Sequence, residues 1–90
     1  MWRAETVGDL IRSVRESLEP TESERGGPEG GLHYLDAGVR CQCHPDTVRM
    51  AEVRGMKAES ARHMLARMVG GPVVLHIGGG WVALSLDGVA

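Results

Sequence analysis

The sequence of 90 residues has no phenylalanine, and its only aromatic residues are Trp2, Tyr34 and Trp81. Valine, leucine, alanine and methionine therefore supply most of the apolar fraction of 42%. A chain of this length has room for one small core and not for two. A core of this size usually needs help from a bound metal or from a partner protein. Length and composition together exclude a large enzyme with a deep pocket.

The chain also lacks a strong excess of one charge, because ten Lys and Arg stand against twelve Asp and Glu. This balance argues against a strongly basic nucleic-acid-binding module. The charge is uneven, with a net −2 over residues 1–25 (six acids, four bases) and a net +2 over residues 45–72 (three acids, five bases). These five bases could form an ordinary solvated helix surface, or they could face an acidic partner. They are Arg49, Arg54, Lys57, Arg62 and Arg67.

Only two cysteines are present, and a single residue separates Cys41 from Cys43. This spacing is a poor geometry for a disulfide between them. The N-terminal region shows no secretory apolar segment, since Arg3, Glu5 and Asp9 interrupt the apolar residues there. We therefore expect a reducing, cytoplasmic setting in which the two thiols are free or bind a metal.

The clearest helical pattern predicts an amphipathic helix over residues 4–19, which Pro20 ends. Its apolar residues are Val7, Leu10, Ile11, Val14 and Leu18. Residues 20–31 consist largely of Gly, Pro and Glu and are expected to form a flexible linker. If the helix does not pack on the rest of the chain, its apolar face needs another surface and would dock on a partner protein.

Residues 32–90 are expected to form a small α+β unit, whose first part is the less clear. Residues 32–40 fit no single pattern, and residues 41–45 read as a turn. From Asp46 onwards the apolar residues suit either a helix or a short strand. Gly55 weakens the case for a single long helix in this region.

The second part of the unit is clearer. An apolar stripe that ends in Gly-Gly-Pro predicts a helix over residues 58–69. Two β-prone runs, residues 73–77 and 81–86, are separated by three glycines and predict a β-hairpin. Residues 68–86 carry no formal charge and are long enough to cross a membrane. Their five glycines and one proline divide the apolar residues into two short blocks, so we expect strands here and no contact with a membrane.

A metal site is the first chemical candidate, because Cys41, Cys43 and His44 supply the thiolate and imidazole groups that zinc prefers. Zinc usually takes four ligands, and strain opposes the binding of one ion by all three residues of a single turn. Further candidate ligands are His76 and Asp87 from the hairpin region, and His33. The alternative interpretation is a pair of reduced cysteines beside a turn.

Catalytic patterns are weak in this sequence. The serines have no recognisable acid or base partner. A nucleophile pair of Cys43 and His76 is conceivable, but nothing in the sequence fixes its orientation. We therefore expect a protein that is not an enzyme.

The predicted hairpin carries a resemblance to a known family. Residues 73–84 read Val-Val-Leu-His-Ile-Gly-Gly-Gly-Trp-Val-Ala-Leu. They resemble the signature of the GAR domain, the growth-arrest-specific-protein-related domain of spectraplakins and their smaller relatives. The upstream Cys41-Gln42-Cys43 resembles the Cys-x-Cys with which that domain opens, so the resemblance covers about residues 35–86. The residues that form its core are Gly78, Gly79, Gly80 and Trp81.

The resemblance implies a small, zinc-containing α+β domain that binds microtubules. We therefore expect a non-enzymatic cytoskeletal interaction module in the cytoplasm, with the five bases of residues 45–72 facing the acidic surface of tubulin. No nucleic-acid partner is expected.

The sequence departs from the family pattern in three respects. The family continues after the tryptophan with a helix and an Asp-Pro-Cys-Arg motif, where this chain has Asp87-Gly88-Val89-Ala90. Residues 56–69 predict a helix where the family has an arginine-rich strand segment. Family members are usually basic, whereas this chain has a net charge of −2. We therefore expect a divergent or truncated relative.

Overall fold

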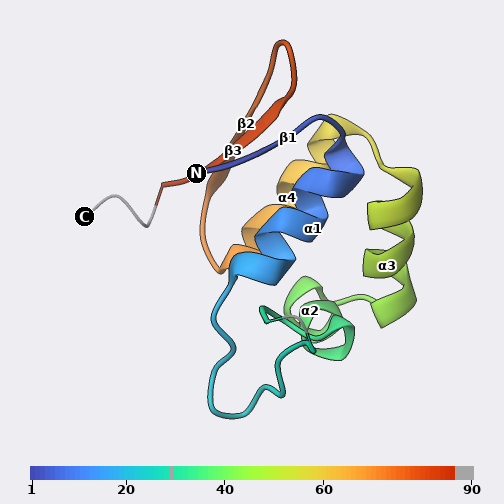
Figure 1. Ribbon diagram of the computed structural model, residues 1–90, viewed down its shortest axis with the longest axis vertical. Coiled ribbons are helices and arrows are strands. Elements are labelled where there is room, and N and C mark those ends of the chain that lie inside the picture. The colour runs from blue at the N-terminus through green and yellow to red at the C-terminus, as the bar shows by residue number, and fades with distance from the viewer. Residues whose placement is uncertain (29, 87–90) are drawn as a thin grey trace.

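The computed structural model describes residues 1–28 and 30–86, which form four helices and a three-stranded antiparallel sheet (Figure 1). This arrangement confirms the expected α+β class. In chain order the elements are β1 (Trp2–Ala4), α1 (Val7–Ser17), α2 (Tyr34–Cys41), α3 (Pro45–Arg54), α4 (Ala58–Val69), β2 (Val73–Ile77) and β3 (Trp81–Ser85).

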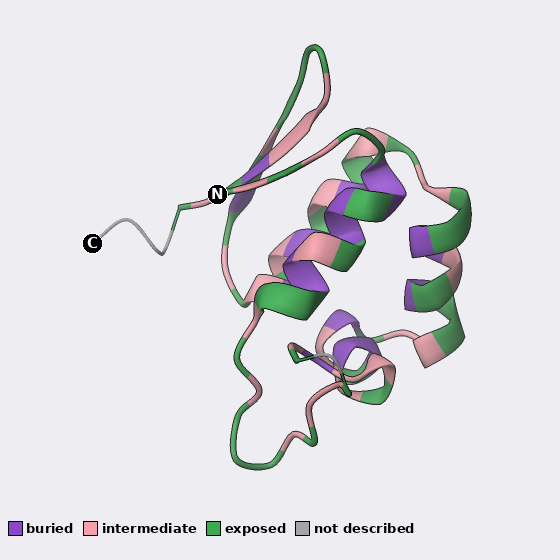
Figure 2. Ribbon diagram, in the orientation of Figure 1, coloured by how far each residue is buried: buried purple, intermediate pink, exposed green. Residues whose placement is uncertain are grey.

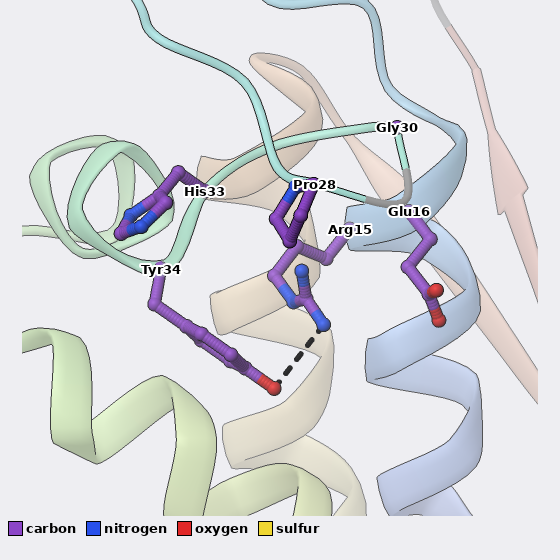
Figure 3. Close-up of a pocket in the computed structure, with 6 residues that line it drawn as sticks. All are labelled: Arg15, Glu16, Pro28, Gly30, His33 and Tyr34. Carbon is purple, nitrogen blue, oxygen red and sulfur yellow. Dashed lines mark hydrogen bonds between the residues drawn. The ribbon is translucent and has the colours of Figure 1, made fainter.

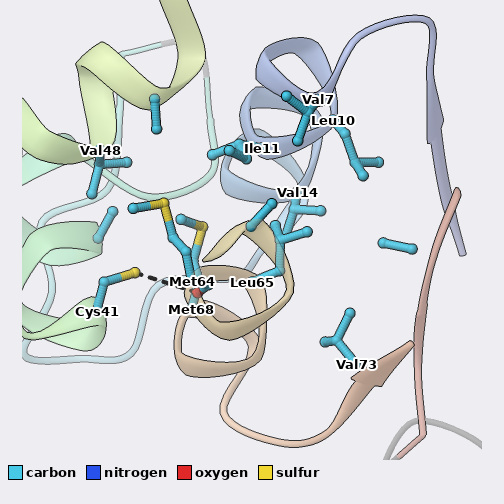
Figure 4. Close-up of a cluster of buried hydrophobic side chains, with 14 of the residues drawn as sticks. Val7, Leu10, Ile11, Val14, Cys41, Val48, Met64, Leu65, Met68 and Val73 are labelled. Carbon is cyan, nitrogen blue, oxygen red and sulfur yellow. Dashed lines mark hydrogen bonds between the residues drawn. The ribbon is translucent and has the colours of Figure 1, made fainter. Parts of the chain in front are cut away.

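The helices enclose one apolar core. Helices α1 and α2 each contact both α3 and α4, and the sides of the helices that face one another carry the buried residues (Figure 2). The large side chains that are completely buried include Leu10, Ile11, Val14, Val48, Leu65 and Met68 (Figure 4). Burial of one such side chain contributes about 1.5–3 kcal/mol, so this cluster is the main source of stability.

The sheet covers one side of this core. Its strand order is β1-β3-β2, and α4 packs against β2 while α1 packs against β1 and β3. Val73 and Ala83 are buried on the inner face. Val74 and Leu84 pair directly across the two strands of the hairpin and are exposed on the outer face.

Helix α1 differs from the prediction in both ends, since it runs from Val7 to Ser17 and not from residue 4 to residue 19, and in its surroundings. It begins at Val7 because Trp2–Ala4 form a strand, and the Thr6 hydroxyl accepts a hydrogen bond from the Asp9 backbone N–H as its N-cap. The apolar face of α1 belongs to the same core as α4. The structure thus has one packed unit instead of a separate N-terminal helix and a C-terminal unit, because the apolar face of α1 is buried within the chain.

The segment expected to be a flexible linker, residues 20–31, forms a loop with fixed contacts in its described part. The Leu32 backbone N–H donates to the carbonyl oxygen of Arg15 at 2.9 Å. The Arg40 guanidinium donates to both carboxylate oxygens of Glu24, at 2.6 and 2.8 Å, and to a backbone carbonyl near the end of α4. The composition of the loop gave no sign of this attachment, because the partner of Glu24 lies outside the loop.

This ion pair makes a pH-dependent contribution to stability. The hydrogen bonds from Arg40, with the Thr21 backbone N–H, lower the pKa of Glu24 from 4.5 to about 2. A carboxylate with a lowered pKa in the folded state stabilises that state above its unfolded pKa and loses the effect as the pH falls through its folded pKa. We expect Glu24→Gln to lower the free energy of unfolding at neutral pH by about 1 kcal/mol.

Urea unfolding of both proteins at a series of pH values checks this expectation. The difference between them should shrink as the pH falls from 4.5 towards 2. A difference that stays constant over this range would show that the charge of Glu24 is not what holds the loop.

Helices α2 and α3 occupy the region that the sequence left open. The turn between them is confined to the three residues that follow α2, and the chain from Asp46 is helical, not a strand. Gln42 ends α2 in the left-handed conformation, with a φ of 58°. His44 is the N-cap of α3, where its Nδ1 accepts a hydrogen bond from the Asp46 backbone N–H. Pro45 follows as the first helical residue, where its lack of an N–H does no harm.

The predicted secondary structure of residues 58–86 is confirmed. Helix α4 has the expected bounds, and the two strands of the hairpin differ from expectation only in that β3 ends at Ser85. The turn requires glycine because Gly79 and Gly80 have φ values of 72° and 147°.

Helices α1 and α3 approach each other closely at Gly8, a buried residue in the first turn of α1. A Cβ atom at this position would overlap the backbone carbonyl oxygen of Glu52. We expect Gly8→Ala to lower the free energy of unfolding by about 1–3 kcal/mol, although alanine is the better helix former. Thermal or urea unfolding measures the change.

Gly78→Ala is the matched control, since its Cβ would lie 3.6 Å from the nearest atom of His76, an ordinary contact. Equal losses of stability in the two variants would contradict the close approach of α1 and α3.

Candidate functional site

A buried cluster of three side chains, Arg15, Tyr34 and Glu52, joins three of the four helices in the described chain. The side chain of Glu52 in α3 has no exposed surface, and its carboxylate accepts a hydrogen bond from Arg15 Nε of α1 at 2.7 Å. It also accepts one from the hydroxyl group of Tyr34 in α2 at 2.7 Å, and Arg12 Nε lies 3.3 Å from it. Arg15 in turn donates to the carbonyl oxygen of Leu32 at 2.9 Å.

The charges of this cluster support one another. Burial opposes the charge of Arg15, but the hydrogen bond and the negative charge of Glu52 outweigh it, so the pKa of Arg15 is raised. Burial, followed by the hydrogen bond to Glu52, raises the pKa of Tyr34. The Arg15 guanidinium also lies 4.0 Å from the centre of the Tyr34 ring, which adds a cation–π contact. Arg15 therefore stays charged and Tyr34 stays protonated at neutral pH.

A cavity of about 320 Å³ lies beside this cluster. Figure 3 shows its wall, in which Arg15 and Tyr34 meet below the loop. The residues that line it are Arg15, Glu16, Pro28, Gly30, His33 and Tyr34. In the described part of the chain no buried side-chain polar atom is left without a hydrogen-bond partner. The cavity thus offers no unpaired buried group that would orient a ligand, and we interpret the cluster as structural.

The cluster gives a direct test of its role. Glu52→Gln keeps the shape of the side chain but leaves the charge of Arg15 buried without a counterion. We expect this change to lower the free energy of unfolding by about 3–5 kcal/mol. Tyr34→Phe removes one hydrogen bond to the same carboxylate and should cost about 1 kcal/mol. Urea unfolding followed by circular dichroism measures both.

Glu59→Gln is the matched control, because Glu59 forms an exposed ion pair with Arg62 on α4 and its loss should change stability little. A loss at Glu52 as small as the loss at Glu59 would contradict the interpretation.

The predicted metal ligands do not come together. Cys41 is buried in the core, where its thiol lies 3.5 Å from the Met64 carbonyl oxygen (Figure 4). His44 is exposed at the start of α3, and His76 is exposed on β2. Among residues 1–28 and 30–86, no three His, Cys, Asp or Glu side chains are grouped so that they could hold a metal ion. Asp87 lies outside the described residues.

Cys41 is also shielded from a metal ion by its burial in the core. Burial, followed by the negative charge of Cys43, raises the pKa of the Cys41 thiol to about 12. The thiol is therefore protonated at neutral pH, and a zinc ion would have to enter the core and displace its proton to bind it. In this arrangement the described residues do not form the predicted zinc site, and zinc binding stays a prediction of the residue types and of the family resemblance. The sequence also offered His33 as a zinc ligand. In the structure its side chain caps the N-terminus of α2 instead.

The five predicted partner-binding residues lie on α3, on α4 and on the turn between them. Arg49 pairs with Asp46 at 3.3 Å, and Arg67 donates to a backbone carbonyl at the end of α2. Arg54 and Lys57 are exposed and have no ion-pair partner within the described chain.

Burial of Glu52 changes the charge of this surface. Residues 45–69 contain three acids, but Glu52 is paired inside the core with arginines of α1. Two exposed acids, Asp46 and Glu59, are left against five bases, so the surface carries a net +3 where the sequence gives +2. The sequence alone could not show this, because the partners of Glu52 are 37 and 40 residues away. The one sequence signal is that Glu52 lies four residues after Val48, on the buried face of α3.

The glycine and tryptophan motif forms the end of the hairpin. The Gly78 N–H donates to the Gly80 carbonyl oxygen at 3.1 Å. Trp81 opens β3 between its two neighbours, Ala4 of β1 and Ile77 of β2, and it is partly buried against the core. In this structure the motif shapes the end of the sheet, and together with Arg3 and Glu5 it lines a cavity of about 330 Å³.

Comparison of the chain with protein-family models, with curated proteins and with solved structures finds no match. No helix within the described residues has both the length and the apolar character needed to cross a lipid bilayer.

Proposed function

We propose that the protein is a non-enzymatic interaction module that binds an acidic protein surface through α3, α4 and the turn between them. The observation that carries this proposal is the burial of Glu52, which leaves a net +3 on the surface of residues 45–69. The whole chain has a net charge of −2, so its charge is separated into a cationic surface and a more acidic remainder. A protein with such a separation approaches an acidic partner in a preferred orientation.

Arg54 and Lys57 are the residues of this surface best placed for binding. Both are exposed, and neither is engaged by an acid in the described chain. Arg49 and Arg62 are held by neighbouring carboxylates on their own helices, so they contribute less charge to a partner. The centre of the proposed surface is therefore the turn between α3 and α4.

Microtubules are the partner that we propose, which places the protein in the cytoplasm on the cytoskeleton. The support is the resemblance of the hairpin and of the Cys-x-Cys segment to GAR domains, together with the acidic surface of tubulin. Docking through α1 has less support, because its apolar face lies in the core and would have to leave it.

Microtubule co-sedimentation at low and at moderate ionic strength tests the proposal. We expect the protein to pellet with microtubules at low salt and to be released as the salt concentration rises, because the exposed charges are screened. Lys57→Glu should weaken binding about fivefold. No pelleting at low salt would exclude microtubules as the partner.

Arg3→Glu is the matched control, since it makes the same change in net charge on β1, at the sheet. It should leave binding nearly unchanged. Equal weakening by the two variants would mean that the overall charge, and not the surface of α3 and α4, governs binding.

A further inference from the structure

The two edges of the sheet are protected differently. Strand β1 forms one edge, and it is only three residues long and carries Arg3 in its centre. Strand β2 forms the other edge with five residues, Val-Val-Leu-His-Ile, which include no Asp, Glu, Lys, Arg or Pro. Short length and charge are two ways in which proteins prevent an edge from pairing with another chain. Strand β1 has both, and β2 has neither.

The segment of the chain that contains β2 carries no acidic residue, lysine or arginine. The chain has 22 charged residues, ten basic and twelve acidic, and none of them lies in residues 68–86. A second copy of this segment could therefore approach β2 without repulsion between like charges, although the whole protein has a net negative charge. The segment also carries exposed apolar side chains: Val74, Ile77, Leu84 and Leu86 are between 39% and 54% exposed.

We propose that β2 pairs with β2 of a second copy, in antiparallel orientation about a twofold axis at Leu75. The two sheets then form one continuous sheet of six strands. In this register Val73 lies opposite Ile77 of the partner subunit, and Val74 lies opposite His76 of the partner subunit. The outer faces that carry Val74 and Leu84 become continuous, and Ile77 lies beside Val73 of the partner subunit, a residue that is 3% exposed in its own subunit.

The interface is small, because it consists of one strand and its side chains from each copy. Interfaces below about 1,200 Å² are at the weak end of specific association, so we expect a dimer that dissociates in the micromolar range or above. The dimer does not depend on the proposed microtubule binding. It would give each assembly two cationic surfaces, which raises the avidity for a repetitive partner.

Sedimentation velocity of the full chain from about 5 to about 500 µM tests the dimer, because association follows mass action. We expect the sedimentation coefficient to rise with concentration towards that of a dimer. Amide hydrogen exchange of residues 73–77 should slow over the same range. A chain that stays monomeric throughout would overturn the proposal, as would a dimer in which exchange of β2 is unchanged.

Two double variants test the register. Val74→Lys with His76→Lys places lysines opposite each other twice across the twofold axis, whereas Val74→Lys with His76→Glu places lysine opposite glutamate. Both positions are exposed, so both variants should fold, which circular dichroism checks. We expect the Lys/Lys variant to dimerise at least about tenfold more weakly than the Lys/Glu variant.

A general charge effect predicts the opposite order. The Lys/Lys variant lowers the net charge from −2 to zero, and so reduces the overall repulsion between copies. Equal association of the two variants, or stronger association of the Lys/Lys variant, would overturn the pairing. If one double variant fails to fold, the single variant His76→Glu takes its place. It puts Glu opposite Val74 of the partner subunit. We expect it to weaken the dimer less than the Lys/Lys variant does, and less than the single variant Val74→Lys does.

Discussion

The fold depends on one carboxylate that has been removed from water. Glu52 could not be buried alone, because an ionised group without partners in an apolar interior is strongly unfavourable. Arg15 of α1 and Tyr34 of α2 both bind it, and Arg15 also binds the carbonyl oxygen of Leu32. Few relative positions of α1, α2 and α3 satisfy all of these groups together, so the cluster selects one arrangement of the helices. The contact of Gly8 with the backbone of the same Glu52 shows how closely α1 must approach.

The same interaction shapes the surface. By taking one acid of α3 into the core, it leaves the exposed residues of α3 and α4 more basic than their sequence. By taking Arg15 of α1 into the core, it leaves the outside of α1 more acidic. A structural ion pair thus separates the charge of a protein whose overall balance is nearly even. The function proposed for α3 and α4 follows from this separation and needs no pocket.

The parts of the fold that could be predicted from the sequence are those with strong local signals. Helix α4 has an apolar stripe and a glycine stop, and the hairpin has two β-prone runs around three glycines, so their bounds were nearly correct. Strand β1 was missed because its three residues are a strand only through pairing with β3, some 80 residues later. Helix α2 was missed because its eight residues include Gly38 and show too few apolar repeats.

The candidate site residues also divide into those that a local sequence pattern indicates and those that only distant contacts bring together. The exposed bases could be found from their spacing, because charge on a helix surface is a local property. The cluster of Arg15, Tyr34 and Glu52 could not, because each member comes from a different helix and nothing in the sequence names its partner. Cys41 and Cys43 suggested a metal by their type and spacing. Cys41, however, lies at the end of α2 with its side chain in the core. This burial results from the packing of α2 against α4, which the sequence does not show.

The pairing of β1 with β3 has a consequence for the order of folding. Residues 2–4 leave the ribosome almost 80 residues before their partners, residues 81–83. Contacts between such distant parts form slowly because a long loop must first be closed. Until then the side of α1 that packs on β1 and β3 has no complete sheet beside it, although α3 and α4 can already cover the rest of its apolar face. The nascent chain must therefore keep this side of α1 from aggregating until the hairpin has been made.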